Sequence, residues 1–316
     1  VLSGLNENMP AAVQLFEKLL ADAQVNKEAY TNMTGDILKA RSDAKLNQGQ
    51  NFSRLMSFAM YGPKSPATNL LTEAELTNMN PQELVDRIHN QNSYKHRILY
   101  YGPSSSKDLL ATINQYHQVP AALKDIPAGN EYSYLETPVT KVLVAPYDAK
   151  QIYMAQISNL DKKYDPAIEP IRALYDEYFG GGMNSIVFQE MRETRGLAYS
   201  AWASIMPPSY LKYPYVLRTQ IATQNDKMID AVTTFNDIIN NMPESEAAFK
   251  LAKDGLTNRL RTERIIKGDI IWSYINAQDL GQNVDPRIKL YNDIQNMTLK
   301  DIVDFQKQWV KGRTYV

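Results

Sequence analysis

An arginine and a tyrosine, Arg192 and Tyr199, stand seven residues apart in the stretch of this chain best suited to chemistry. A guanidinium offers several hydrogen-bond donors and a fixed charge, and a phenol donates one further hydrogen bond. Such donors can hold a carbonyl oxygen and stabilise the negative charge that develops on it. The glycines Gly180, Gly181 and Gly182 precede this pair, followed by Ser185. Because glycine lets another backbone approach closely, we expect these four residues to contact an extended peptide.

The same residues also fit purely structural roles. Tyr199 is typical of an aromatic side chain that packs in the core at the start of a strand. Arg192 could pair with Glu193 or with the helix dipole, and the glycines could end a helix at Phe179. Arg195 fits a dipole or salt-bridge role better than a catalytic one, so the predicted catalytic set contains only Arg192 and Tyr199.

The composition excludes several kinds of site. The chain has no cysteine, which rules out disulfides, a thiolate zinc site and a cysteine nucleophile. The three histidines are His89, His96 and His117, and their spacing contains no His-x-x-Glu-His zinc motif. We therefore expect that this chain itself binds no metal.

Charge and hydropathy narrow the partners in the same way. A net charge of −1 over 316 residues gives no electrostatic reason to expect nucleic acid or an anionic membrane. No apolar run approaches the roughly 18 residues of a membrane span. The compartment is left open by the sequence, and a soluble protein of the bacterial periplasm is compatible with it.

Hydrophobic periodicity and turn residues predict the elements that must position Arg192 and Tyr199. The first part reads as mainly helical, and the second part mixes strands with helices. Expected helices cover residues 9–23, 28–46, 52–61, segments starting near 73 and 81, 105–116, 165–179, 227–241, 244–266, 270–280 and 299–311. Expected strands cover residues 97–101, 141–145, 152–158, 198–206, 214–223 and the short segment 313–316.

An internal repeat predicts the domain organisation. Met9, Ala12, Val13 and Phe16 recur 219 residues later as Met228, Ala231, Val232 and Phe235, and weaker matches continue to the end of the chain. Residues 1–101 therefore resemble 220–316, whereas the glycine loop has no counterpart. We expect an α+β fold built from repeated units, with an antiparallel-rich mixed sheet covered by helices.

The repeat implies one partial and one nearly complete unit, and a natural protein that begins further upstream. The predicted boundaries are 1–118 for the C-terminal part of a first, mostly helical unit, 119–138 for a linker, and 139–316 for the second unit, whose last strand is cut short.

A long ordered match identifies a family. Residues 188–200 read Phe-Gln-Glu-Met-Arg-Glu-Thr-Arg-Gly-Leu-Ala-Tyr-Ser after the glycine loop. This stretch resembles the signature in the C-terminal half of the M16 zinc metallopeptidases, the family of pitrilysin, insulin-degrading enzyme and the mitochondrial processing peptidase. The resemblance implies homologous α/β units paired around a large chamber. It also implies that Arg192 and Tyr199 are the arginine and tyrosine that reach the substrate.

The resemblance implies a function shared with another part of the protein. In the family a separate unit carries His-x-x-Glu-His and binds zinc, and this chain lacks that motif. We expect the C-terminal portion of a zinc metalloendopeptidase, inactive on its own, which binds a peptide or small protein and stabilises the scissile carbonyl. Zinc would be held by another domain or a partner subunit. The alternative is a non-catalytic M16-like subunit that binds peptides or serves a structural role.

Overall fold

The computed structural model describes residues 1–316, which form two compact units. The first unit contains residues 1–46 and 70–131, and the second contains residues 47–69 and 132–316. Residues 47–69 interrupt the first unit in sequence but pack with the second. The sequence-based boundaries at 1–118, 119–138 and 139–316 remain predictions. None of the helices combines the length and the apolar character needed to cross a bilayer.

The first unit is helical. Side chains at the first turns begin several of its helices, since Asn26, Thr72 and Ser105 each accept a hydrogen bond from a backbone N–H three residues later. Helix α1 packs against α5 and α6, and α2 packs against α4. The helices are α1 (Met9–Ala21), α2 (Lys27–Lys45), α4 (Glu73–Asn78), α5 (Gln82–Asn90) and α6 (Ser106–Tyr116).

The strand expected at residues 97–101 is wrong. This segment has no regular secondary structure, and the only bridge nearby joins Tyr94 to Lys124. A β-strand needs a neighbouring strand to take up its backbone hydrogen bonds, and the first unit contains no sheet that could supply one. The alternating apolar pattern of the segment was therefore not sufficient.

The second unit is built on an antiparallel sheet with the order β1-β3-β2, formed by β1 (Gln151–Lys163), β2 (Ser200–Met206) and β3 (Pro214–Gln224). The strands expected near 152–158, 198–206 and 214–223 are confirmed. The strand expected at 141–145 is wrong, because the segment is irregular and only Lys141 joins it to the chain end, through Tyr315 O at 2.9 Å. The sheet thus pairs β1 with β3 and not with residues 141–145.

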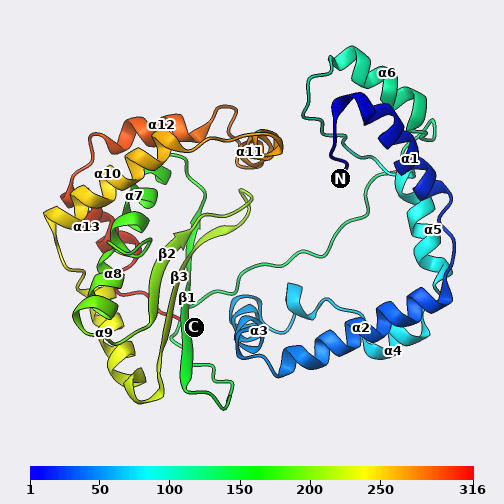
Figure 1. The fold of residues 1–316 in the computed structure, drawn as a ribbon. Helices are drawn as coiled ribbons and strands as arrows, with labels where there is room; N and C mark the ends of the chain where they lie inside the picture. Colours follow the sequence, from blue (N-terminus) through cyan, green and yellow to red (C-terminus); the bar gives the residue numbers. More distant parts are fainter. The chain divides into compact units, whose positions relative to one another are not determined.

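Helices cover one face of this sheet and form the core (Figure 1). Large side chains such as Tyr175, Phe179, Leu217, Ile221 and Phe235 are fully buried there. The helices are α7 (Glu169–Phe179), α8 (Ile186–Phe188), the π-helical turn η4 (Gln189–Thr194), α9 (Met228–Asn240), α10 (Glu246–Thr262), α12 (Pro286–Ile294) and α13 (Leu299–Trp309). A further helix, α11 (Gly268–Asp279), lies between α10 and α12 in sequence.

The opposite face of the sheet carries α3 (Gln48–Tyr61) (Figure 1). The ring of Phe52 meets Tyr153 of β1 edge-on, with 5.7 Å between the ring centres. Gln48 Nε2 donates to Gln151 O at 2.6 Å, and Met60 O accepts from the N–H of Leu135 at 2.7 Å. These contacts explain why the helix groups with the second unit.

The internal repeat is visible in the helix positions. The short turn Asn6–Asn8 that leads into α1 corresponds to the turn Asn225–Lys227 that leads into α9, again 219 residues later. Helices α1 and α9 both contain 13 residues, and α2 and α10 also begin 219 residues apart. The fold is therefore α+β with a repeated unit, of which only the second copy includes a sheet.

Candidate functional site

The glycine loop begins where α7 meets the sheet. Gly180 is buried, and a Cβ placed on it would lie 2.2 Å from Ala203 O in β2. No side chain fits at that distance, so glycine is required here by the packing of α7 against β2. A Cβ on Gly181 would lie 2.8 Å from Asp176 O in the last turn of the same helix. Only Gly182 faces open space.

Ser185 points inward. Its side chain is buried, and its Oγ donates to Gly182 O at 2.6 Å and accepts from the N–H of Phe188 at 3.4 Å. Ser185 is therefore the N-cap of α8 and fastens the glycine loop to that helix. Of the four residues expected to contact a peptide, Gly181 and Gly182 are exposed, and Gly180 and Ser185 are enclosed.

A π-helical turn brings Arg192 and Tyr199 together. The turn spans Gln189–Thr194, and Gly196 follows in the left-handed region with φ +57°. The N–H groups of Leu197 and Ala198 both donate to Met191 O, at 2.8 and 3.2 Å. These bonds reverse the chain sharply, so a helix residue and the first strand residues share one corner. Inserted turns of this kind are frequently found at functional sites.

The guanidinium of Arg192 lies against two aromatic rings. Its Cζ is 5.1 Å from the ring centre of Phe188 and 5.7 Å from that of Tyr199. Contacts of this kind hold a cation by the ring quadrupole and leave the N–H groups at the guanidinium edge available. The side chain of Arg192 is 46% exposed and Tyr199 is 72% exposed. The predicted pair is thus together and open to solvent.

Neighbouring charges separate Arg192 from Arg195. Arg195 forms an ion pair with Glu190 at 3.2 Å, as the sequence suggested, whereas Arg192 meets Glu193 only loosely at 3.6 Å. Sequence reasoning did not include Phe188, although its position four residues before Arg192 places the two on one helical face. That spacing was the available signal.

Backbone contacts fix the corner from below. The N–H of Tyr199 donates to Ala222 O at 2.9 Å, and Thr223 Oγ1 donates to Leu197 O at 2.5 Å. Lys227 Nζ, at the entrance to α9, donates to Gly196 O at 3.0 Å. Strand β3 and the start of α9 therefore hold Tyr199 in place through the main chain and leave its ring free.

A buried ion-pair network closes the outer edge of β2. Asp176 accepts from the N–H of Ile205 and from Ser204 Oγ, both at 2.9 Å, and pairs with Arg172 at 2.8 Å. Burial raises the pKa of Asp176 to about 6, although Arg172 and the two donors oppose the rise. Burial would lower the pKa of Arg172, but its pairs with Glu169 and Asp176 raise it.

The chain offers no set of ligands that fits zinc. No three His, Asp or Glu side chains lie together in a way that could hold a metal ion. His96 and His117 approach each other with 2.8 Å between their Nε2 atoms, while His117 Nδ1 faces Glu17 and His96 Nδ1 faces Tyr94 O. Structural and catalytic zinc sites in proteins use three or four protein ligands, which this pair does not provide.

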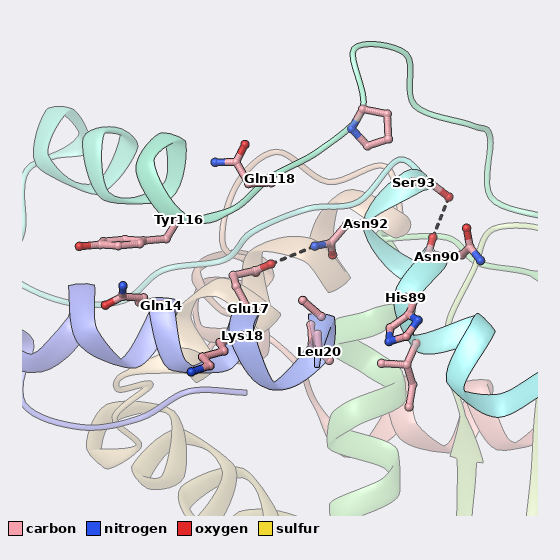
Figure 2. Close-up of a pocket in the computed structure, with 13 residues that line it drawn as sticks. Gln14, Glu17, Lys18, Leu20, His89, Asn90, Asn92, Ser93, Tyr116 and Gln118 are labelled. Carbon is pink, nitrogen blue, oxygen red and sulfur yellow. Dashed lines mark hydrogen bonds between the residues drawn. The ribbon is translucent and has the colours of Figure 1, made fainter. Parts of the chain in front are cut away.

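A cavity of about 630 Å³ lies in the first unit, away from Arg192 and Tyr199 (Figure 2). Glu17 faces Asn92 there, accepting from its Nδ2 at 2.9 Å with one oxygen, and its other oxygen faces His117. Lys18, His89, Tyr116 and Gln118 complete much of the wall. With Glu17 already engaged on both oxygens, the cavity shows no group arranged for catalysis.

The family of the chain follows from its sequence profile. The model of the family described as the peptidase M16 inactive domain matches residues 98–256, which is half of the chain. The chain belongs to the peptidase M16 inactive-domain family. The matched range includes the glycine loop, η4 and all three strands of this M16 domain. No curated protein sequence matches the chain.

Solved structures show the same fold. A peptidase M16 inactive domain from Pseudomonas fluorescens superposes with a TM-score of 0.66 at 17% identity, over 97% of this chain and 73% of that one. A protease from Helicobacter pylori gives 0.64 at 11% identity, over 96% and 74%. The periplasmic protease PqqL from Escherichia coli gives 0.66 at 14% identity, with 96% of this chain matching 34% of PqqL. This M16 domain thus corresponds to about a third of PqqL.

Proposed function

We propose that this chain is the arginine- and tyrosine-bearing part of an M16-type zinc metalloendopeptidase. Arg192 and Tyr199 bind an extended peptide and donate hydrogen bonds to its scissile carbonyl. A His-x-x-Glu-His unit on another domain or subunit holds zinc, which supplies the activated water. The observation that supports this most is the exposed corner on which the Arg192 guanidinium lies between Phe188 and Tyr199.

The geometry assigns a separate task to each residue. Tyr199 has one phenolic donor, suited to the oxygen on which negative charge develops. Arg192 has several donors along an exposed edge, suited to neighbouring carbonyls of the peptide. Gly181 and Gly182 provide side-chain-free backbone beside the corner, while Ser185 and Gly180 hold the loop in position. Zinc is not a ligand of this chain in the proposal, so the chain alone is inactive.

The test uses the complete enzyme with its zinc-bearing unit. Tyr199→Phe and Arg192→Ala should each lower peptide turnover by roughly two to three orders of magnitude, because each removes a donor to the developing charge. Zinc content, measured by elemental analysis, should stay constant. Arg195→Ala and Tyr210→Phe are matched controls on exposed side chains and should retain activity. Undiminished cleavage by the Tyr199 and Arg192 variants would refute the assignment.

A second candidate is a non-catalytic subunit that binds peptides or supports a partner. The family description as an inactive domain favours it, together with the lack of a ligand set. The two proposals differ in one measurement: the non-catalytic subunit would remain inactive after addition of any zinc-bearing M16 unit. A periplasmic location is also a proposal, prompted by the periplasmic relative PqqL, and cell fractionation would test it.

A further inference from the structure

Arg218 lies on the sheet face opposite the helices of the core. In the register of the sheet it stands between Ile157 of β1 and Ser204 of β2. Residues paired across strands share a face, and side chains alternate along each strand. Trp202 and Tyr153 therefore lie on the same face as Arg218, and α3 covers the part of it near Tyr153.

The Arg218 guanidinium has neighbours but no acceptor of matching strength. Its Cζ lies 5.3 Å from the ring centre of Trp202, and Nη2 donates to Met56 Sδ at 3.2 Å. A thioether sulfur is only a weak acceptor. Nε is shielded from solvent and has no hydrogen-bond partner. The remaining N–H groups of this cation thus have only solvent or a bound ligand to satisfy them.

A comparison with Arg172 shows what Arg218 lacks. Arg172 pairs with Glu169 and Asp176, both at 2.8 Å, and these pairs raise its pKa. No carboxylate contacts Arg218, and burial lowers the pKa of its guanidinium, opposed only by the phenol of Tyr134. A partly buried charge without a counter-ion is costly. Arg218 therefore contributes nothing to stability that an apolar side chain could not provide.

We infer that Arg218, lying on Trp202, is a binding site for a carboxylate of the peptide. Guanidinium binds carboxylate with two parallel hydrogen bonds, and the flat stack on Trp202 keeps the fork in one orientation. The inference rests on the proposed function, since it assigns the chemistry of the substrate. The carboxylate comes either from an Asp or Glu side chain or from the peptide's C-terminus.

The sheet sets the distance between this site and the catalytic corner. Arg218 is level with Ser204, which is five residues beyond Tyr199. At about 3.3 Å per residue this is roughly 16 Å along the strand. An extended peptide has the same rise, so its carboxylate lies about five residues from the carbonyl held at Tyr199. The substrate class is thus a peptide with a negative charge about five residues from the cleaved bond.

Isothermal titration calorimetry of the full chain with three N-acetylated decapeptides tests the inference. One peptide carries a single Glu and a C-terminal amide, the second carries Gln and the amide, and the third carries Gln and a free C-terminal carboxylate. We expect the Glu peptide, the free-carboxylate peptide, or both to bind about tenfold more tightly than the uncharged one. Whichever peptide gains affinity identifies the source of the carboxylate.

Arg218→Gln should abolish this gain and leave the affinity for the uncharged peptide unchanged, and Arg218→Lys should retain part of it. Arg192→Ala, by contrast, should weaken all three peptides alike. If no peptide binds, the proposed peptide-binding function fails. Sodium acetate then tests the site alone, by raising the melting temperature of the wild type but not that of Arg218→Gln.

A stability measurement separates this role from a structural one. Arg218→Met should raise the melting temperature, because it removes a charge without a counter-ion, whereas loss of a stabilising arginine would lower it. Circular dichroism checks that each variant is folded. Equal affinity for all three peptides together with no Arg218-dependent response to acetate would overturn the inference, as would a carboxylate preference that survives in Arg218→Gln.

Discussion

Helices α1 and α9 occupy equivalent places in the repeat but differ in what surrounds them. Phe235 of α9 is fully buried, whereas its counterpart Phe16 in α1 is 37% exposed. Ile238 is 2% exposed and its counterpart Leu19 is 63% exposed. Both helices have the same length and the same preceding turn. The apolar stripe is thus enough to form the helix, but it does not determine whether the stripe is covered.

The sheet accounts for the difference. Helix α9 packs on β3, and Gln156 of β1 donates to Asn236 of the helix at 2.6 Å. Helix α1 contacts only other helices in its unit, which contains no strand. Local sequence therefore specifies the helix, and a partner distant in sequence specifies its buried face.

The largest effect should come from the buried member of the first pair. Phe235→Ala removes a fully enclosed ring and should lower the free energy of unfolding of the second unit by about 3–5 kcal/mol. Phe16→Ala should lower that of the first unit by less than about 1 kcal/mol, because much of the ring is already in water. Urea titration followed by circular dichroism, with hydrogen exchange to separate the units, measures both. Equal losses would break the comparison.

A smaller effect should depend on pH and concern the second unit alone. The pKa of Asp176, raised to about 6, means that the folded state holds this proton more tightly than the unfolded state. The stabilisation from the protonated carboxyl is complete below about pH 4 and is lost as the pH rises through about 6. Two pH units correspond to about 3 kcal/mol at most.

Asp176→Asn should flatten this part of the stability profile between pH 4 and 7, as measured by urea unfolding at each pH. Asp254→Asn, on an exposed position of α10, is the matched control and should keep the slope of the wild type. If the slope of the second unit persists in Asp176→Asn, another group is responsible. A matching slope in the first unit would show that the sheet is not its cause.

The smallest effect should be the same in both units. Asn26 caps α2 and Ser245 caps α10 at equivalent positions of the repeat, accepting from the N–H of Ala29 at 2.9 Å and of Ala248 at 3.2 Å. Changing either cap to alanine should cost about 1 kcal/mol, because the bond is local and needs no sheet. Hydrogen exchange in the first turns of α2 and α10 reports each cost. A large difference would show that caps, too, depend on tertiary context.

The contrast between the two helices also explains which predictions succeeded. Helices with an apolar stripe and a capping side chain were found close to their observed bounds, because both signals are local. The strands expected at 97–101 and 141–145 were wrong, because a strand exists only where a distant segment pairs with it. Helix α12 was not expected, although Asp285 as its N-cap and Pro286 in its first turn were visible signals.

The site was predicted in the same partial way. The motif named Arg192 and Tyr199, and the structure brings them together. Its spacing did not reveal that a π-helical turn places Phe188 under Arg192, since an inserted residue changes the periodicity. Nor could it show that Ser185 and Gly180 are enclosed, because their burial depends on β2 and on the path of the loop.

The position of α3 has a practical consequence for dividing the protein. The helix lies at residues 48–61, yet it supports Tyr153 and touches Arg218 in the sheet. A polypeptide that starts after the segment 119–138 would contain every strand and the catalytic corner but would lose this support. It would expose an aromatic face and change the environment of the only cation on it. Dissection at the sequence boundary would therefore remove a part of the second unit, and an inactive product would say nothing about Arg192 or Tyr199.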